Sequence, residues 1–295
     1  MSELQFQKKV KELIPNEDDR DQLFSLLRHY QATQDLNRLL SDLRILLNEP
    51  NKLELYDFMR PMILMRHQIE YSRRVPAVPG VKLRVIRLMR RPGESLGFAV
   101  RGGFEHGVGI FVTQVTLGSQ AEKQGLRVGD EIVKVNGFNI SEAIHEDVLN
   151  LIKSKDEIVL KVTNIGMLPT KNEPTDLVKW EYVNSLLEDS NQDEGKRNQP
   201  RDIKIFIDSS GHASIGCSIF SESGPTARYP GIYVEKVRPG SIAEEVGLEA
   251  GDQIVEVNDI SFRNITWKEA VLALKSSRQL NMIIRKKTGS QQLQR

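Results

Sequence analysis

Two short loops in this sequence have the composition of an anion-binding turn. They are Ser95-Leu96-Gly97-Phe98 and Ser214-Ile215-Gly216-Cys217, and each leads directly into an apolar segment. Glycine allows the backbone to approach a ligand closely or to adopt unusual dihedral angles. Successive backbone N–H groups in such a loop form a concave site for an anion. An extended peptide could therefore add beside the following strand while the loop amides hold its terminal carboxylate.

A glycine-containing quartet alone is a weak signal, because glycine is common in ordinary turns. Here a second motif follows each quartet, with the pattern Gly-Leu-x-x-Gly-Asp-x-Ile-Val-x-Val-Asn. It occupies residues 125–136 in the first copy and 247–258 in the second. Two tandem domains of one fold are the simplest explanation of a repeated pair of motifs.

With both motifs in place, each copy resembles a PDZ domain, over residues 81–166 and 202–288. The resemblance implies a curled antiparallel sheet or barrel capped by two helices, with a groove that binds C-terminal peptides. In the first domain the implied groove residues are Ser95, Leu96, Gly97, Phe98, Ala99, Val100, His145, Leu149 and Ile152, with Arg91 or Arg90 beside the carboxylate. In the second domain they are Ser214, Ile215, Gly216, Cys217, Ser218, Ile219, Trp267, Val271 and Leu274.

The residue that begins the second helix of each copy differs, being His145 in the first and Trp267 in the second. In the PDZ family, a histidine there resembles the class that accepts Ser or Thr two residues before the peptide end, since imidazole can bond the hydroxyl. An indole offers a large apolar face and one donor instead. We therefore expect the second groove to favour a hydrophobic or aromatic residue at that place, and the two grooves to prefer different peptides.

Residues 1–75 precede the repeats and contain no glycine. Asn16 followed by acidic residues predicts a helix start, and Asn48-Glu49-Pro50 predicts the end of the next helix along the chain. We expect an all-α bundle of four or five short helices. Core packing is the simplest explanation of its apolar faces, and a peptide-binding groove along the bundle is the alternative. The apolar residues at helical spacing are Leu23, Leu26, Leu27 and Tyr30, then Leu36, Leu39, Leu40, Leu43 and Leu47.

The segments around the repeats divide into linkers, a strand and an extension. We expect linkers at 76–80 and 189–201 and a tail at 289–295. Val81, Leu83 and Val85 alternate with arginines, which predicts a half-buried strand with these apolar side chains inside. Residues 167–188 include Trp180 and Tyr182, which would be unusual in a free linker, so we expect this extension to pack on the first PDZ domain.

The whole layout resembles the harmonin family of scaffold proteins, carried by stretches such as Leu46-Leu47-Asn48-Glu49-Pro50 and Trp180-Glu181-Tyr182-Val183. That resemblance implies a cytoplasmic scaffold of the submembrane cytoskeleton in actin-rich protrusions, stereocilia or microvilli. The implied partners are C-terminal tails of cadherin-type adhesion proteins, an unconventional myosin, and peptide segments at the N-domain. A sterile-alpha-motif scaffold would bind the first PDZ domain together with Trp180 and Tyr182. The family pattern continues into a coiled coil and a third PDZ domain.

Composition limits the other function classes. The net charge is +1, so no overall field attracts nucleic acid. The single cysteine excludes a disulfide framework and favours a reducing, intracellular setting. The first ten residues are polar and do not resemble a signal peptide. No apolar run approaches the roughly 20 residues needed to span a bilayer.

Two alternative functions follow from other residue clusters. Ser209-Ser210-Gly211-His212 is the nearest approach to a catalytic group, but it lies in the second loop without a protease-sized domain around it. The histidines show no metal-ligand spacing with Cys217, which we interpret as a small buried apolar residue. We therefore expect no catalytic residue, metal or cofactor. The second alternative is membrane-surface binding through a basic patch, although a solvated strand face explains the patch more simply. The patch consists of Arg84, Arg87, Arg90 and Arg91.

Overall fold

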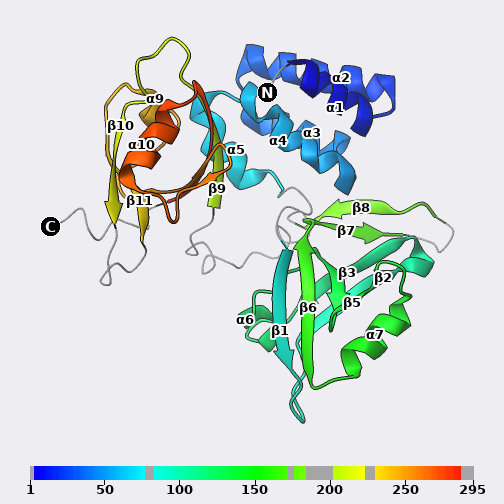
Figure 1. The fold of residues 1–295 in the computed structure, drawn as a ribbon. Coiled ribbons are helices and arrows are strands. Elements are labelled where there is room, and N and C mark those ends of the chain that lie inside the picture. The colour runs from blue at the N-terminus through cyan, green and yellow to red at the C-terminus, as the bar shows by residue number, and fades with distance from the viewer. Residues whose placement is uncertain (1–2, 77–82, 172–175, 184–201, 223–229, 287–295) are drawn as a thin grey trace.

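The computed structural model describes residues 3–76, 83–171, 176–183, 202–222 and 230–286. The linker predicted at 189–201 and the tail at 289–295 lie outside these residues, as do most of the linker at 76–80 and the end of the extension. Figure 1 shows a helical N-domain followed by two curled antiparallel sheets, each with two helices, as the sequence predicted.

The N-domain contains five α-helices, which are α1 (Glu3–Leu13), α2 (Glu17–Thr33), α3 (Leu36–Leu46), α4 (Glu54–Met59) and α5 (Gln68–Arg74). The predicted helix start is confirmed, because the Asn16 side chain accepts a hydrogen bond from Asp18 N at 2.8 Å. Such a cap satisfies one of the free N–H groups at a helix start. Leu23, Leu27 and Tyr30 are buried on one face of α2 and pack on the apolar face of α3.

Both repeats have one topology, and in each the groove strand lies at the end of its sheet. The sheet orders are β1-β6-β4-β3-β2 and β10-β11-β12-β14-β9. The first repeat consists of β1 (Leu83–Met89), β2 (Phe98–Gly103), β3 (Val108–Val115), β4 (Asp130–Val135), β5 (Phe138–Asn139), β6 (Glu157–Asn164), α6 (Gln120–Lys123) and α7 (His145–Lys153). The second consists of β9 (Asp202–Asp208), β10 (Cys217–Glu222), β11 (Gly231–Val237), β12 (Gln253–Val257), β13 (Ile260–Ser261), β14 (Gln279–Arg285), α9 (Ile242–Glu245) and α10 (Trp267–Lys275).

The prediction of which face of β1 is buried was wrong. Leu83 and Val85 are exposed by 49% and 55%, whereas Ile86 and Leu88 face the core. Arg84 lies on the core side at the end of the strand, where its guanidinium bonds the fully buried Asp130 carboxylate and Gly125 O. A buried carboxylate needs a paired cation. The Arg84–Asp130 pair therefore decides which face of β1 turns toward the core, and the simple alternation of apolar and charged residues does not. Val81 lies outside the described residues.

The extension after the first repeat forms a hairpin of β7 (Met167–Thr170) and β8 (Lys179–Tyr182). The hairpin contacts both the first repeat and the N-domain. Trp180 packs edge-on against Phe111 of β3, with ring centroids 5.3 Å apart. Tyr182 faces the N-domain, where its hydroxyl donates to Leu47 O at 2.5 Å. Met167 and its neighbours join the N-domain core. The hairpin therefore connects the first repeat to the helical bundle in addition to packing on the repeat.

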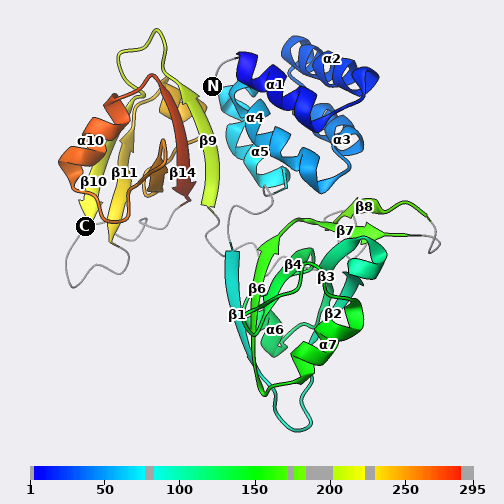
Figure 2. The same cartoon turned by 45° about the vertical axis from the view of Figure 1, so that its right-hand side comes forward.

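A second interface joins the N-domain to the distant second repeat, as α5 lies beside β9 in Figures 1 and 2. β9 is the outer strand of its sheet, so one row of its backbone groups needs partners. Gln68, which is fully buried, accepts from Phe206 N at 3.1 Å. Arg60, only 3% exposed, donates to Lys204 O at 2.7 Å, and the Ser72 hydroxyl bonds the same oxygen. Side chains of the N-domain thus cap the strand edge.

Charge strengthens this interface. Lys204 Nζ lies 2.7 Å from Asp57 Oδ2, and Arg60 Nη2 lies 3.0 Å from Asp57 Oδ1. Burial alone would raise the pKa of Asp57, but the two cations outweigh it and lower that pKa. The carboxylate is therefore ionised whenever the interface is formed at neutral pH. Because the hairpin holds the first repeat and β9 holds the second, the N-domain links both repeats.

We predict that Phe206→Ser separates the second repeat from the N-domain. Phe206 is 6% exposed and lies on the face of β9 opposite to Ile205 and Ile207, toward α5. Losing a buried aromatic side chain costs about 3 kcal/mol. The radius of gyration from small-angle scattering should rise, and the first thermal transition should move to lower temperature. The control is Arg87→Ser, because Arg87 occupies the matching position between two core residues of β1 and is exposed. Unchanged scattering for Phe206→Ser would contradict the interface.

Candidate functional site

Each candidate loop turns at a glycine in the left-handed region of the backbone map. The angle φ is +79° at Gly97 and +86° at Gly216. A Cβ atom on either glycine would lie 2.2 Å from the Cβ of a serine, Ser119 or Ser241, at the start of the following short helix. Such a contact is impossible without moving the backbone, so only glycine lets the loop close on its helix.

Backbone hydrogen bonds hold the two loops in the same shape. Gly97 O accepts from Thr116 N at 2.8 Å, and Gly216 O accepts from Arg238 N at 2.8 Å. Leu96 O is likewise engaged behind the first loop. Within a planar peptide unit the following N–H points the opposite way, out of the loop. In the structure Gly97 N–H donates to the Ser95 hydroxyl oxygen of the same loop at 3.1 Å, so a carboxylate held by this amide would take the place of that hydroxyl.

The first groove contains an apolar cavity of about 310 Å³. Its walls come from three elements: the end of the loop, strand β2 and helix α7. The lining residues are Leu96, Phe98, Ala99, Val100, His145, Leu149 and Ile152. All seven were among the residues predicted for this groove, and the structure brings them together around one space. The cavity is large enough for a single apolar side chain beside the loop amides.

The hydrogen bonds of His145 determine what this side chain can offer a peptide. Its Nδ1 lies 2.8 Å from Gly102 O, and its backbone N–H donates to the Glu105 carboxylate. A carbonyl oxygen only accepts, so Nδ1 carries the proton of the neutral ring. The other nitrogen, Nε2, is then an acceptor at the cavity wall. This tautomer suits a ligand hydroxyl, which donates its proton to Nε2.

The second groove has the same frame and a different lining. Cys217, Val271 and Leu274 are partly buried and pack on the core of the second repeat. Trp267 is 49% exposed, and its Nε1 donates across the groove to Ile219 O on β10 at 3.0 Å. A capping box between Thr266 and Glu269 fixes the start of α10. The indole therefore lies over the groove strand with its donor already engaged. Ser214 and Ser218 are exposed along the same groove.

Two arginines lie near the first loop, and their environments differ. Arg90 Nη2 donates to Ile152 O at 3.0 Å, at the end of α7 that lines the cavity, and its Nε is buried without a partner among the described residues. Arg91 is exposed, with Glu94 3.9 Å away. Contact between Arg91 and the carboxylate of a tail stays a prediction. Arg90 lies closer to the groove lining, through its bond to Ile152 O.

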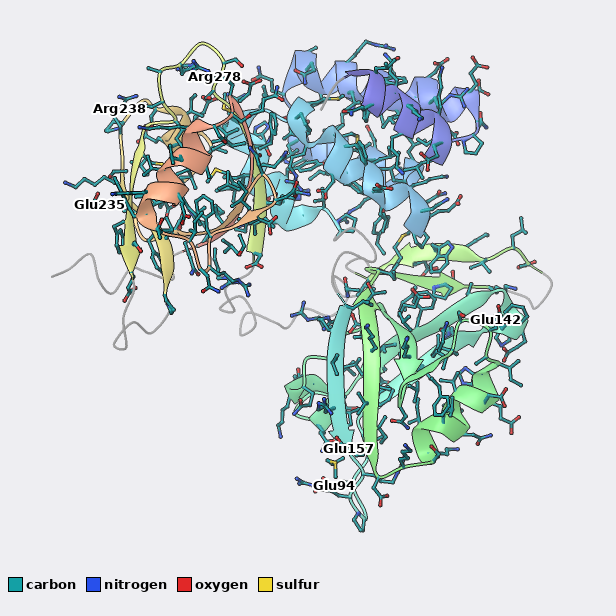
Figure 3. The ribbon with its side chains drawn as sticks, in the orientation of Figure 1. Glu94, Glu142, Glu157, Glu235, Arg238 and Arg278 are labelled. Carbon is teal, nitrogen blue, oxygen red and sulfur yellow. The ribbon has the colours of Figure 1, made fainter. Side chains whose placement is uncertain are left out.

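Two basic residues at the second loop were not predicted from the sequence. Figure 3 places Arg238 and Arg278 at the loop end of the second repeat, whereas Glu94 and Glu157 lie at that end of the first. Arg238 Nη2 lies 3.5 Å from the place a Gly216 Cβ would take. Arg278 Nη1 donates to His212 O at 2.7 Å. They come from the end of β11 and from beyond α10, so no local motif could reveal them.

The described residues give no sign of other site chemistry. No group of three or more His, Cys, Asp or Glu side chains among them is placed to hold a metal ion. No helix in this part of the chain is long and apolar enough to cross a membrane.

Comparison with known proteins assigns a family to each of the three domains. Residues 3–73 match the N-terminal domain of harmonin, and residues 85–163 and 204–285 match the PDZ domain. These matches confirm the predicted resemblance.

Several known proteins are similar to this chain. Mouse whirlin is 33% identical over 311 residues, which cover 92% of this chain and 33% of whirlin. Human PDZ domain-containing protein 7 is 33% identical over 214 residues, covering 69% of this chain and 20% of that protein. A crystal structure of the Dlg1 PDZ2 domain from the choanoflagellate Monosiga brevicollis is 31% identical and covers 28% of this chain and 97% of that structure, with a TM-score of 0.26. The chain spans about a third of the length of mouse whirlin.

We predict that Cys217 reacts slowly with alkylating agents despite its place in the second loop. Burial raises the pKa of this thiol to about 11. Since only the thiolate reacts, alkylation by iodoacetamide at pH 7.5 should be about 100-fold slower than that of an ordinary exposed thiol. The rate should keep rising toward pH 11. Intact-mass measurement gives the rate, with the protein in guanidinium as control, and equal rates in both states would contradict the prediction.

Proposed function

Because the chain belongs to the PDZ family and carries a harmonin-type N-terminal domain ahead of its two PDZ domains, we propose that it is a scaffold that holds the C-terminal tails of other proteins. These families are adaptors without enzyme activity. A tail adds to β2 or β10 as one more antiparallel strand, and the loop amides hold its carboxylate. The observation that carries this proposal is the first groove, where loop amides and an apolar cavity adjoin on one strand edge.

The first groove suits tails that end in an apolar residue with Ser or Thr two residues earlier. The last side chain fills the cavity, and the hydroxyl donates to Nε2 of His145. The second groove suits tails with a hydrophobic or aromatic residue at that earlier place, since Trp267 presents a ring there. One short tail buries little area, so micromolar affinity, on the order of −8 kcal/mol, is expected for each groove.

The proposed partners follow from the harmonin resemblance. They are cytoplasmic tails of cadherin-type adhesion proteins, an unconventional myosin, a sterile-alpha-motif scaffold at the first PDZ domain, and peptide segments at the N-domain. The proposed location is the submembrane cytoskeleton of actin-rich protrusions such as stereocilia or microvilli. Matches to whirlin and to PDZ domain-containing protein 7 support a scaffold role in general terms.

The basic patch offers less support for membrane-surface binding. Each of its four arginines lies beside a carboxylate or carbonyl oxygen of the protein. Arg84 bonds Asp130, Arg90 bonds Ile152 O, Arg87 lies 3.5 Å from Glu157, and Arg91 lies 3.9 Å from Glu94. Neighbouring carboxylates reduce the attraction to an anionic surface. Peptide capture is therefore better supported than membrane-surface binding.

A titration with tail peptides tests the proposal. A labelled peptide ending in Thr-x-Leu should bind as the free acid, and its C-terminal amide should bind at least about tenfold more weakly, because the amide loses charge-assisted bonds to the loop. His145→Ala should weaken binding of the acid about 3- to 10-fold. Trp267→Ala, in the second groove, serves as the matched variant and should not weaken binding of this peptide. Equal binding of acid and amide would rule out carboxylate capture.

The hairpin should contribute to binding of a larger partner at the first PDZ domain. Trp180 is partly exposed on β8 and packs against Phe111 of β3, the strand next to the groove strand β2. We predict that Trp180→Ala lowers affinity for a sterile-alpha-motif domain with its tail about tenfold, as expected for an aromatic residue at the centre of an interface. The isolated tail should bind as before. Lys179→Ala, on the same strand, is the control, and equal losses for domain and tail would contradict a hairpin contact.

A further inference from the structure

The second groove is bridged by one of its own side chains. Trp267 begins α10, and its indole N–H donates to Ile219 O on the facing strand at 3.0 Å. The ring is 49% exposed, so it lies at the surface of the groove rather than in the core. The carbonyl that it bonds points across the groove, and so belongs to the open edge of β10.

That carbonyl is the one a bound tail would need. Outward-facing groups of an antiparallel edge strand recur at every second residue. If the carboxylate sits in the loop, the last tail residue pairs with Cys217 and the residue two before it pairs with Ile219. This register rests on the proposed function of the groove. The tail's third-last N–H and the indole N–H therefore compete for the same oxygen.

The first groove differs at this point. His145, which occupies the position of Trp267, bonds Gly102 O. Gly102 lies two residues further along β2 than Val100, the counterpart of Ile219. The imidazole thus reaches past the third-last position and leaves room there for a tail. The indole, which is longer and carries its donor at a different place, reaches that position itself.

We propose that the Trp267 indole itself closes the second groove in the free protein, because it occupies the place of a tail's third-last residue through its bond to Ile219 O. A tail enters only by displacing the indole from Ile219 O and supplying its own N–H to that oxygen. The displaced ring offers an apolar face and a donor, and no acceptor for a hydroxyl. The accepted class is therefore tails with a large apolar third-last residue and a free N–H there. Ser or Thr gains no acceptor, and proline or an N-methylated residue cannot replace the lost hydrogen bond.

The capping box limits how the groove can open. Thr266 Oγ1 accepts from Glu269 N, and the Glu269 carboxylate accepts from Thr266 N at 2.9 Å. These reciprocal bonds hold the backbone at the helix start. Opening therefore requires rotation of the Trp267 side chain, and α10 stays in place. The indole N–H is a direct reporter of that rotation.

The test compares three peptides with free carboxylates and one variant. The peptides carry Leu, N-methyl-Leu or Thr at the third-last position and Leu at the end. Trp267→Phe keeps an aromatic ring and removes the donor. We expect this variant to bind the Leu peptide about 3- to 10-fold more tightly than the wild type, because no internal hydrogen bond has to break. In the wild type, N-methylation and Thr should each weaken binding.

A second measurement needs no variant. The indole Nε1–H of Trp267 should give a shifted nuclear magnetic resonance signal and faster hydrogen exchange once the Leu peptide binds. Leu272→Ala is the control, since Leu272 is 67% exposed on the same helix and should leave affinity unchanged. If Trp267→Phe binds no more tightly and the indole signal stays fixed while the Leu acid still binds better than its amide, this inference is wrong and the carboxylate loop stands. If acid and amide bind equally, both fail.

Discussion

The steric constraint at Gly97 and Gly216 fixes the shape of the candidate groove in each repeat. A side chain there would overlap the serine that begins the next helix, at 2.2 Å between Cβ atoms. With glycine, the loop closes on that serine and its carbonyls are held from behind by Thr116 N or Arg238 N. The amides must then face outward, next to the open edge of β2 or β10. Loop, strand edge and helix therefore meet at one place because one backbone conformation is permitted there.

On this shared frame the two grooves have acquired different chemistry through a few side chains. His145 presents a nitrogen acceptor because Gly102 O holds its proton on Nδ1. Trp267 presents an aromatic ring, and its indole N–H donates to Ile219 O of the groove strand. At the loop, Arg238 replaces Thr116 and brings a cation near Gly216. Each change leaves the backbone hydrogen bonds intact, since the frame is held by main-chain groups. Specificity can therefore vary between the repeats without loss of fold.

Local sequence predicted the features that local chemistry controls. The loop quartets and the Asn16 cap follow from short motifs, whereas the seven residues around the first cavity follow from the resemblance to PDZ domains. The buried face of β1 could not be predicted in this way, because it depends on Asp130, a partner 46 residues away. The contact of Gln68 with Phe206 N spans 138 residues. In the sequence, Gln68 is an ordinary polar helix residue, and only the folded chain shows the strand edge that it caps.

The N-domain then sets how the two grooves are oriented. The hairpin fixes it to the first PDZ domain through Tyr182, and Arg60, Gln68 and Lys204 fix it to the second. In Figures 1 and 2 the loop before β10 lies at the top of the molecule and the loop before β2 at the bottom. Two tails bound in the proposed way would therefore place their carboxylate ends at opposite ends of the molecule. A flexible spacer of about 20 residues has an end-to-end distance of roughly 25 Å, so tails rooted in one membrane need such spacers to engage both grooves. A rigid central domain then favours partners whose tails are long enough to occupy both grooves at once. Partners would thus be selected by the length of their tails as well as by the sequence of the tail ends.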